Sequence, residues 1–227
     1  CLDEPLALGP EDSGSPAAPT FWRAYPGETA TISGGRPVGG WQSATVAGKT
    51  AWRTVLPQVA AGAWNFRQLF VQRRGEPCFE RRYRPHRGML VVAGLTYSPQ
   101  RKAMAHRAAQ QDFVFFPGDL RQWENLADVE LVALHSWSAS RLRIRELDLE
   151  RNVVTLSSVP TFRIGHWYKD ERNPYYVENL KEELKEPGQW YLDRPSGALT
   201  YLPLPGETPE NTTVVAPVLE QLLVLRG

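Results

Sequence analysis

Glycine and proline interrupt the chain so often that long regular elements have little room to form. The 227 residues include 18 glycines and 19 prolines. Proline presets φ and glycine accepts positive φ, so both residues favour turns. The apolar stretches between these turns are short, as in residues 111–116 and 129–137. About a dozen short strands separated by turns predict a mainly all-β fold of the sandwich or barrel type.

The composition permits a buried core and disfavours several classes of partner. Hydrophobic residues make up 42% of the chain, so it can bury a core. Its length is enough for one large or two small domains. Lys and Arg number 26 against 25 Asp and Glu, so charge gives no reason to expect nucleic acid or an anionic membrane as a partner. No apolar run approaches the roughly 20 residues that a membrane span needs. The two cysteines imply no disulfide framework.

Alternating apolar and polar residues predict two hairpins. Residues 142–156 alternate with a change of phase, which predicts a bulge or bend before the turn. Residues 189–193 and 198–202 form a second hairpin around a Pro-Ser-Gly turn. Strands are also expected at residues 20–24, 29–33, 68–72 and 220–225, and a loop at residues 43–49.

Two short helices are also expected. Asn173 can cap a helix and Pro174 suits its first position, with apolar residues following at helical spacing, so the sequence predicts a helix near 174–185. Apolar residues three apart predict a shorter helix over 118–126, with Asp119 as its cap.

The two ends of the chain both have strand character. Residues 1–8 read as a strand without a signal-like segment, and the last strand stops without closing structure. We therefore expect the chain to be a piece of a longer protein. A mature lipoprotein would also begin with a cysteine such as Cys1, but it usually continues through a flexible Ser/Gly linker.

Four ordered motifs carry a resemblance to a known family. In this order and spacing, the chain resembles the N-terminal part of right-handed parallel β-helix proteins of the bacterial glycoside hydrolase type. The motifs are Pro10-Glu-Asp-Ser-Gly14 with Tyr25-Pro-Gly27, Ile32-Ser-Gly-Gly35 and Trp41; Trp64-Asn-Phe-Arg-Gln-Leu-Phe-Val71 with Arg81-Arg-Tyr-Arg-Pro85; Phe116-Pro-Gly-Asp-Leu120 with Trp123, Asn125 and His135-Ser-Trp137; and Tyr175-Tyr-Val-Glu-Asn179 with Glu186-Pro-Gly-Gln-Trp-Tyr-Leu-Asp193.

The resemblance implies a division of the chain and a role. Residues 1–35 would be strands of the first β-helix rungs, residues 36–215 an inserted β-sandwich-like domain, and residues 216–227 a return strand. The whole would be a fragment of a secreted, periplasmic or cell-surface enzyme acting on oligo- or polysaccharides. The piece itself would be non-catalytic and would shape the substrate groove, with its own missing β-helix as a further partner.

The chain departs from the family in two places. The turn after the Leu-Phe-Val strand is Gln72-Arg-Arg-Gly75 with three inserted residues, where the family usually has a tight glycine turn. The basic, alanine-rich residues 95–111 match none of the motifs.

His135 and Trp137 are the candidate substrate-groove residues. Residues two apart in a strand share a face, so the indole could stack on a sugar ring while the imidazole binds a hydroxyl. The competing interpretation is a core tryptophan beside a hydrogen-bonded histidine. The six arginines of residues 73–87 could bind an anionic sugar or nucleic acid, but a solvated strand whose arginine stems cover aromatic rings is favoured.

No catalytic constellation, metal site or cofactor is predicted from the sequence. Glycoside hydrolysis needs two carboxylates about 5–10 Å apart, and no pair has a spacing that demands it; Asp193 is expected at the mouth of a hairpin turn. The four histidines are scattered, without partners at ligand spacing. The alternative hypothesis is a carbohydrate-binding or cell-surface structural module with no enzymatic activity, which exposed, coplanar aromatic rings would favour.

Overall fold

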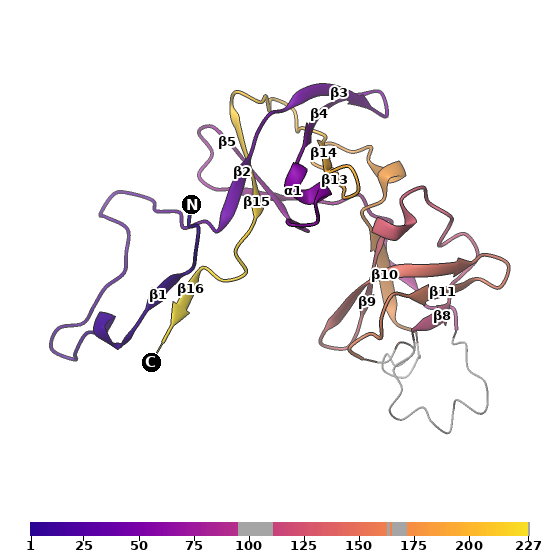
Figure 1. Ribbon diagram of the computed structural model, residues 1–227, viewed down its shortest axis with the longest axis horizontal. Helices are drawn as coiled ribbons and strands as arrows, with labels where there is room; N and C mark the ends of the chain where they lie inside the picture. The colour runs from indigo at the N-terminus through magenta and orange to yellow at the C-terminus, as the bar shows by residue number, and fades with distance from the viewer. Residues whose placement is uncertain (95–110, 163, 165–171, 227) are drawn as a thin grey trace.

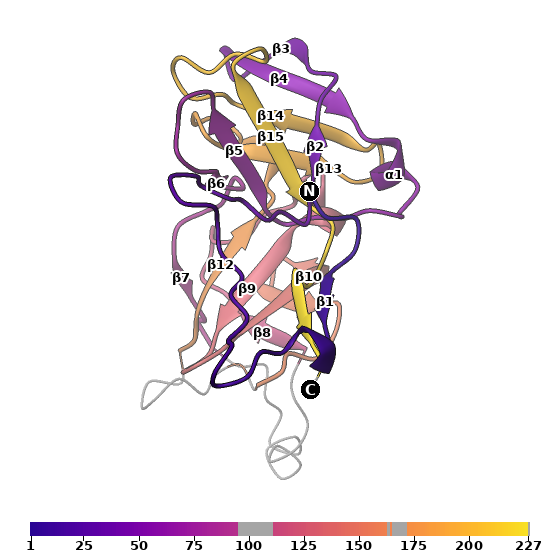
Figure 2. The same ribbon diagram turned by 90° about the vertical axis from the view of Figure 1, so that its left-hand side faces the viewer.

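The protein is mainly β, and three parts can be distinguished in it (Figure 1). The computed structural model describes residues 1–94, 111–162, 164 and 172–226. We call the parts the sandwich unit (residues 35–82 and 190–217), the barrel unit (residues 84–184) and the terminal arm (residues 1–34 and 218–226). The arm and the barrel unit both extend from the sandwich unit and are separated from each other in Figure 1, while Figure 2 shows the sandwich unit above the barrel unit.

Two four-stranded sheets make up the sandwich unit. Residues from both sheets, among them Leu69, Val214, Trp190 and Leu199, pack into one core. The first sheet has the order β2-β15-β5-β6 and the second β13-β14-β4-β3. The elements are β2 Gly35–Val38, β3 Gln42–Val46, β4 Lys49–Val55, helix α1 Pro57–Ala60, β5 Leu69–Arg73, β6 Glu80–Arg82, β13 Trp190–Asp193, β14 Ala198–Tyr201 and β15 Thr212–Pro217.

One six-stranded sheet, in the order β7-β12-β9-β10-β11-β8, forms the barrel unit. Backbone hydrogen bonds between Gly94 and Val114 join the segment after β7 to β8, so the two edges of the sheet meet. The enclosed core of buried residues includes Phe113, Leu131 and Tyr175. The elements are β7 Leu90–Val91, β8 Asp112–Val114, 3₁₀ helix η2 Leu126–Asp128, β9 Glu130–Leu134, β10 Ala139–Asp148, β11 Val153–Leu156, β12 Pro174–Glu178 and 3₁₀ helix η3 Lys181–Glu183.

The terminal arm brings the two ends of the chain together. Strands β1 Leu6–Leu8 and β16 Leu223–Leu225 pair in parallel, with Leu6 opposite Leu223. A 3₁₀ helix, η1 Pro10–Asp12, follows β1. Residues 20–24 and 29–33 contain no strand, so those two predictions were wrong.

Both predicted hairpins are confirmed. Strands β10 and β11 pair antiparallel with a register shift between Ile144 and Glu146, where the change of phase predicted a bulge. Strands β13 and β14 pair from Trp190 opposite Tyr201 to Asp193 opposite Ala198. The predicted loop at residues 43–49 was wrong. Ala47 and Gly48 both adopt positive φ, the backbone of a two-residue hairpin turn, and β3 and β4 therefore pair directly.

The predicted helix near 174–185 was also wrong. Strand β12 occupies its first half, pairs with β9, and buries Tyr175 and Val177 in alternation with half-buried neighbours. Asn179 has a φ of 62°, which ends the strand and is incompatible with a helix. Only the short η3 follows.

The second predicted helix, over 118–126, is an irregular segment that starts at a turn. Gly118 has a φ of 86°, and the amide of Asp119 donates to the carbonyl of Phe116. Leu120 and Trp123 are buried in the barrel core without a helix. The mainly β fold is thus present, while the flanking β-helix rungs and the boundaries at residues 35 and 215 stay predictions.

Candidate functional site

His135 and Trp137 lie at the β9–β10 turn of the barrel unit, and they do not share a strand face. Strand β9 ends at Leu134, so the two-residue alternation no longer applies. His135 is buried and its Nε2 lies 2.8 Å from the Ser140 Oγ, whereas Trp137 is 84% exposed. Phe162 joins them, with ring centroids 5.7 Å from His135 and 6.2 Å from Trp137.

This corner contains one exposed indole and one buried, neutral imidazole. Burial lowers the pKa of His135, so the ring is uncharged at neutral pH. The planes of Trp137 and Phe162 cross at 80°, so the two rings do not form a flat platform. Trp137 is the more exposed of the two rings and presents a face on which a sugar could stack.

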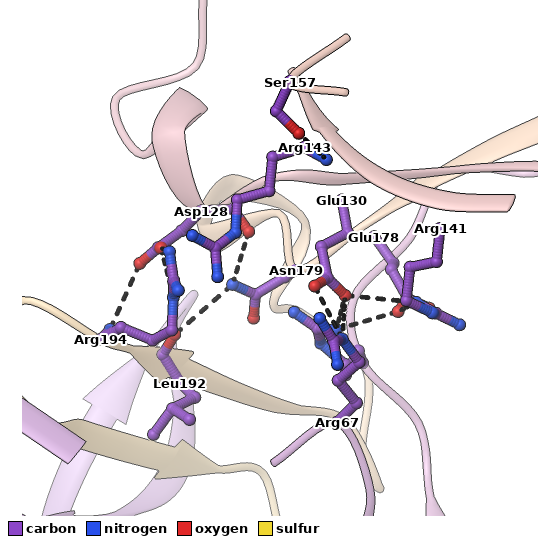
Figure 3. A network of polar contacts seen from close by, with 11 residues as sticks. Arg67, Asp128, Glu130, Arg141, Arg143, Ser157, Glu178, Asn179, Leu192 and Arg194 are labelled. Carbon is purple, nitrogen blue, oxygen red and sulfur yellow. Dashed lines mark hydrogen bonds and ion pairs between the residues drawn. The ribbon is translucent and has the colours of Figure 1, made fainter. Parts of the chain in front are cut away.

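A larger polar site lies where the barrel unit meets the sandwich unit (Figure 3). Its centre is Glu130, a 4% exposed residue at the start of β9. The Glu130 carboxylate accepts hydrogen bonds from Arg67 Nε at 2.8 Å and from Arg84 Nη1 at 2.7 Å. Arg141 on β10 pairs with both Glu130 and Glu178, and Arg84 also reaches Glu178 at 2.9 Å. Three arginines therefore share two carboxylates.

A second group of contacts extends this network into the sandwich unit. Asp128 of η2 pairs with the guanidinium of Arg194, which lies in the turn after β13. The side-chain amide of Asn179 donates to the carbonyl of Asp128 and to that of Leu192. Side chains of the barrel unit are thus hydrogen-bonded to backbone and side chains of the sandwich unit, as Figure 3 shows.

The environment keeps the Glu130 carboxylate ionised. Burial alone would raise its pKa, but the charge of Arg84 and hydrogen bonds from Arg67 and Arg84 outweigh burial and hold the pKa below its ordinary value. The pKa values of Glu124 and Glu183 are also lowered, by Lys181 and Lys185 respectively. A general acid of a glycosidase needs a raised pKa, whereas the pKa values of these three carboxylates are lowered. The three groups are therefore suited to pairing with cations and not to donating a proton.

A cleft of about 780 Å³ opens beside the Asp128 end of the network. One wall is the sheet β13-β14-β4-β3, and the other is formed by η2, η3 and residues that flank them. Its lining mixes small apolar residues such as Ala127 with charged ones such as Arg53 and Lys181. The volume is within the range of small-molecule sites, while the lining is more polar than is usual for them.

The arginine-rich residues 73–87 are used mainly for internal pairing. Arg82 is buried and bonds Glu207, Glu80 and the Tyr201 hydroxyl, and Arg84 is part of the Glu130 network. Arg81 lies over the Tyr83 ring and Arg84 over the Trp190 ring, as the favoured interpretation expects of arginines that cover aromatic rings, but Arg84 is buried and not solvated. The segment is therefore less solvated than the sequence indicated.

The two carboxylates assigned local roles differ in outcome. Asp193 pairs with the Ser196 hydroxyl at the hairpin turn, as expected. Asp119 caps no helix and accepts a hydrogen bond from the Tyr175 hydroxyl at 3.2 Å.

Within the described residues, no three His, Cys, Asp or Glu side chains are grouped as metal ligands, and no helix is long and apolar enough to span a membrane. Nearly all of the basic stretch 95–111 lies outside the described residues.

Sequence reasoning missed both the Glu130 network and the cleft. A signal for the network exists in the sequence, since Glu130 interrupts the apolar run of residues 129–134 and a buried carboxylate requires cationic partners. The cleft has no comparable signal, because its lining comes from six separate segments of the chain.

Comparison with known proteins assigns the family. The family model of the GH141 insertion domain matches residues 48–204. The chain belongs to this family. The matched residues cover the barrel unit and most of the sandwich unit, and therefore the whole Glu130 network and all of the cleft lining except residues 44–46.

A solved structure is similar over almost the whole of this GH141 insertion-domain chain. It is titled "Glycoside hydrolase", has 25% sequence identity and a TM-score of 0.67, and aligns with 98% of this chain. The chain spans only 37% of that structure's length. No curated protein matches the sequence.

Proposed function

We propose that the chain is the non-catalytic N-terminal portion of a secreted glycoside hydrolase whose main domain is a right-handed parallel β-helix. Its insertion domain would shape one wall of the substrate groove, and catalysis would reside in rungs that follow residue 227. Export to the periplasm, the cell surface or the medium belongs to the same proposal. The similarity of nearly the whole chain to about a third of a glycoside hydrolase carries it.

The terminal arm supports the β-helix part of the proposal. Strands β1 and β16 pair in parallel, and parallel sheets are normally buried on both faces. A pair of strands by itself is marginally stable. Leu223 and Leu225 are nevertheless exposed, as are Phe21 and Trp22 in the same arm. Further parallel strands stacked on this pair would cover these side chains.

The β9–β10 turn supports a role at the groove. Trp137 is the most exposed large aromatic residue of the described chain, and the buried His135–Ser140 pair anchors the turn that carries it. We assign Trp137 as the sugar-stacking residue and His135 as its support. This keeps both sequence candidates but gives them different tasks.

The test compares three polypeptides from the complete gene. The complete product should hydrolyse at least one of a panel of aryl glycosides, and the 227-residue chain alone should hydrolyse none. A version with residues 36–215 replaced by a short linker should show altered KM or specificity for polysaccharides. Turnover by the 227-residue chain alone, or no turnover by the complete product, would overturn the proposal.

A second candidate function is a carbohydrate-binding or cell-surface module without enzymatic activity. The exposure of Trp137 favours it, because exposed tryptophans are the usual contacts for sugar rings. The crossed planes of Trp137 and Phe162 count against a flat binding platform. Retention of the chain on insoluble polysaccharide, lost in Trp137→Ala, together with an inactive complete gene product, would select this function.

A further inference from the structure

We infer that the cleft between the sheet β13-β14-β4-β3 and the segment around η2 and η3 is a binding subsite for a neutral saccharide. This inference deepens the proposed function, because it gives the insertion domain a sugar contact of its own, distinct from Trp137. It rests on the unsatisfied polar groups, the charge and the size of the cleft.

Two polar oxygens at the cleft lack hydrogen-bond partners among the described residues. The Tyr191 hydroxyl is one, on a side chain that is 5% exposed, and the Asn125 Oδ1 is the other. The Asn125 amide nitrogen is already engaged, since it donates to the Asn179 carbonyl at 2.8 Å. Buried polar groups without partners are uncommon in folded proteins and call for an explanation.

One of these two oxygens can donate a hydrogen bond, and the other can only accept one. Burial and the nearby carboxylates of Asp193 and Asp128 raise the pKa of Tyr191 by more than the adjacent Asn125 side chain lowers it. The Tyr191 hydroxyl therefore keeps its proton and can donate it. The Asn125 Oδ1 can only accept. A hydroxyl group both accepts and donates, so one sugar hydroxyl can satisfy both oxygens. Because neither oxygen touches solvent in the free chain, the half-buried Asn125 side chain has to move aside on binding.

The charges of the cleft select against anionic sugars. Its lining includes Glu124, Asp128, Glu182 and Asp193 against Arg53 and Lys181. Lys181 pairs with Glu124, and Arg194 pairs with Asp128. No excess of positive charge is therefore available to hold the carboxylate of a uronic acid. Neutral hydroxyls can still bond the carboxylates of Asp193 and Glu182.

The size and the apolar part of the lining fit a short oligosaccharide. A volume of about 780 Å³ lies within the ordinary range of ligand pockets. Val46, Leu184 and Ala198 line it together with the polar groups. Sugar rings present both apolar C–H faces and hydroxyls, and this mixed lining matches both.

The experiment titrates the 227-residue chain with neutral hexasaccharides of β-linked glucose and of β-linked xylose, and with trigalacturonate. Binding is followed by calorimetry and by NMR shifts. We expect at least one neutral hexasaccharide to bind and trigalacturonate not to bind. Tyr191→Phe should weaken binding about fivefold, the effect of about one hydrogen bond. Tyr83→Phe, at an exposed tyrosine away from the cleft, should leave binding unchanged.

A second variant keeps the test valid if Tyr191→Phe does not fold. Ala127 lines the cleft and is exposed, so Ala127→Trp fills the space without disturbing a core and should abolish binding. Absence of binding by both neutral hexasaccharides, or binding that survives both variants, would overturn the inference. An ordered water bridging the two oxygens, with no sugar bound, would do the same. Each of these results leaves the proposed function standing, because that function is tested by hydrolysis with the complete gene product.

Discussion

The terminal arm and the two packed units use the same kinds of apolar residue in opposite ways. Leu131 and Trp190 are fully buried in the barrel and sandwich units. In the arm, Leu225 is 72% and Trp22 62% exposed. The units have sheets of four or six strands that share or enclose a core, whereas the arm is one pair of strands with no second layer among the described residues. Packing stabilises the units, whereas the arm is held by one strand pair and by backbone hydrogen bonds such as those from Val218 and Leu219 to the Gly34 carbonyl.

The largest effect is expected at the junction of the two units. Glu130→Ala would leave Arg67, Arg84 and Arg141 without their shared carboxylate, and breaking a buried ion pair costs about 3–5 kcal/mol. Urea unfolding measures this loss. Glu80→Ala is the matched control, because Glu80 is exposed and its partner Arg82 keeps Glu207; it should cost less than about 1 kcal/mol. Equal losses in both variants would contradict the role assigned to the network.

A matched pair of leucines compares the arm with the barrel core. Leu131→Ala creates a cavity in the core and should lower the free energy of unfolding by about 2–5 kcal/mol. Leu225→Ala removes an exposed side chain from the arm and should change it by less than about 0.5 kcal/mol. Thermal or urea unfolding of the chain measures both. A large loss in Leu225→Ala would mean that the arm is packed in solution, for example against a second copy.

Acid should destabilise the packed units in two separate pH windows. Burial lowers the pKa of His135 in the folded chain, so the unfolded chain binds a proton at this histidine more readily. The free energy of unfolding should therefore begin to fall as the pH drops below 6.5, the ordinary pKa of histidine. The lowered pKa of Glu130 acts in the same direction, but only below its ordinary value of 4.5. Stability measured against pH should lose its upper window in His135→Gln and keep its lower one. An unchanged upper window in this variant would contradict the assignment.

The smallest effect on stability is expected at Trp137. Its side chain is 84% exposed, so Trp137→Ala should change the free energy of unfolding by less than about 0.5 kcal/mol. The same measurement on Trp190→Ala, in the sandwich core, should show a loss of about 3–5 kcal/mol. Similar losses at both sites would mean that Trp137 packs against residues outside the described part of the chain.

Elements that depend on neighbouring residues could be predicted. The β13–β14 hairpin and the bulged β10–β11 hairpin follow from turn residues and alternation within about fifteen residues. The β3–β4 hairpin escaped prediction because its turn places Ala47, an ordinary residue, at positive φ. The candidate site was predicted only in part, since Phe162 joins His135 and Trp137 across more than twenty residues of sequence.

By itself the sequence determined that the chain is mainly β, that its local hairpins form where they do, and that it resembles part of a glycoside hydrolase. Only the tertiary structure decided between strand and helix at residues 174–178, because pairing with β9 buries Tyr175 and Val177 on one face. It also decided the partners of Glu130 and the lining of the cleft. Ion pairs and clefts of this kind join segments far apart in the chain, and their formation depends on packing that no local pattern records.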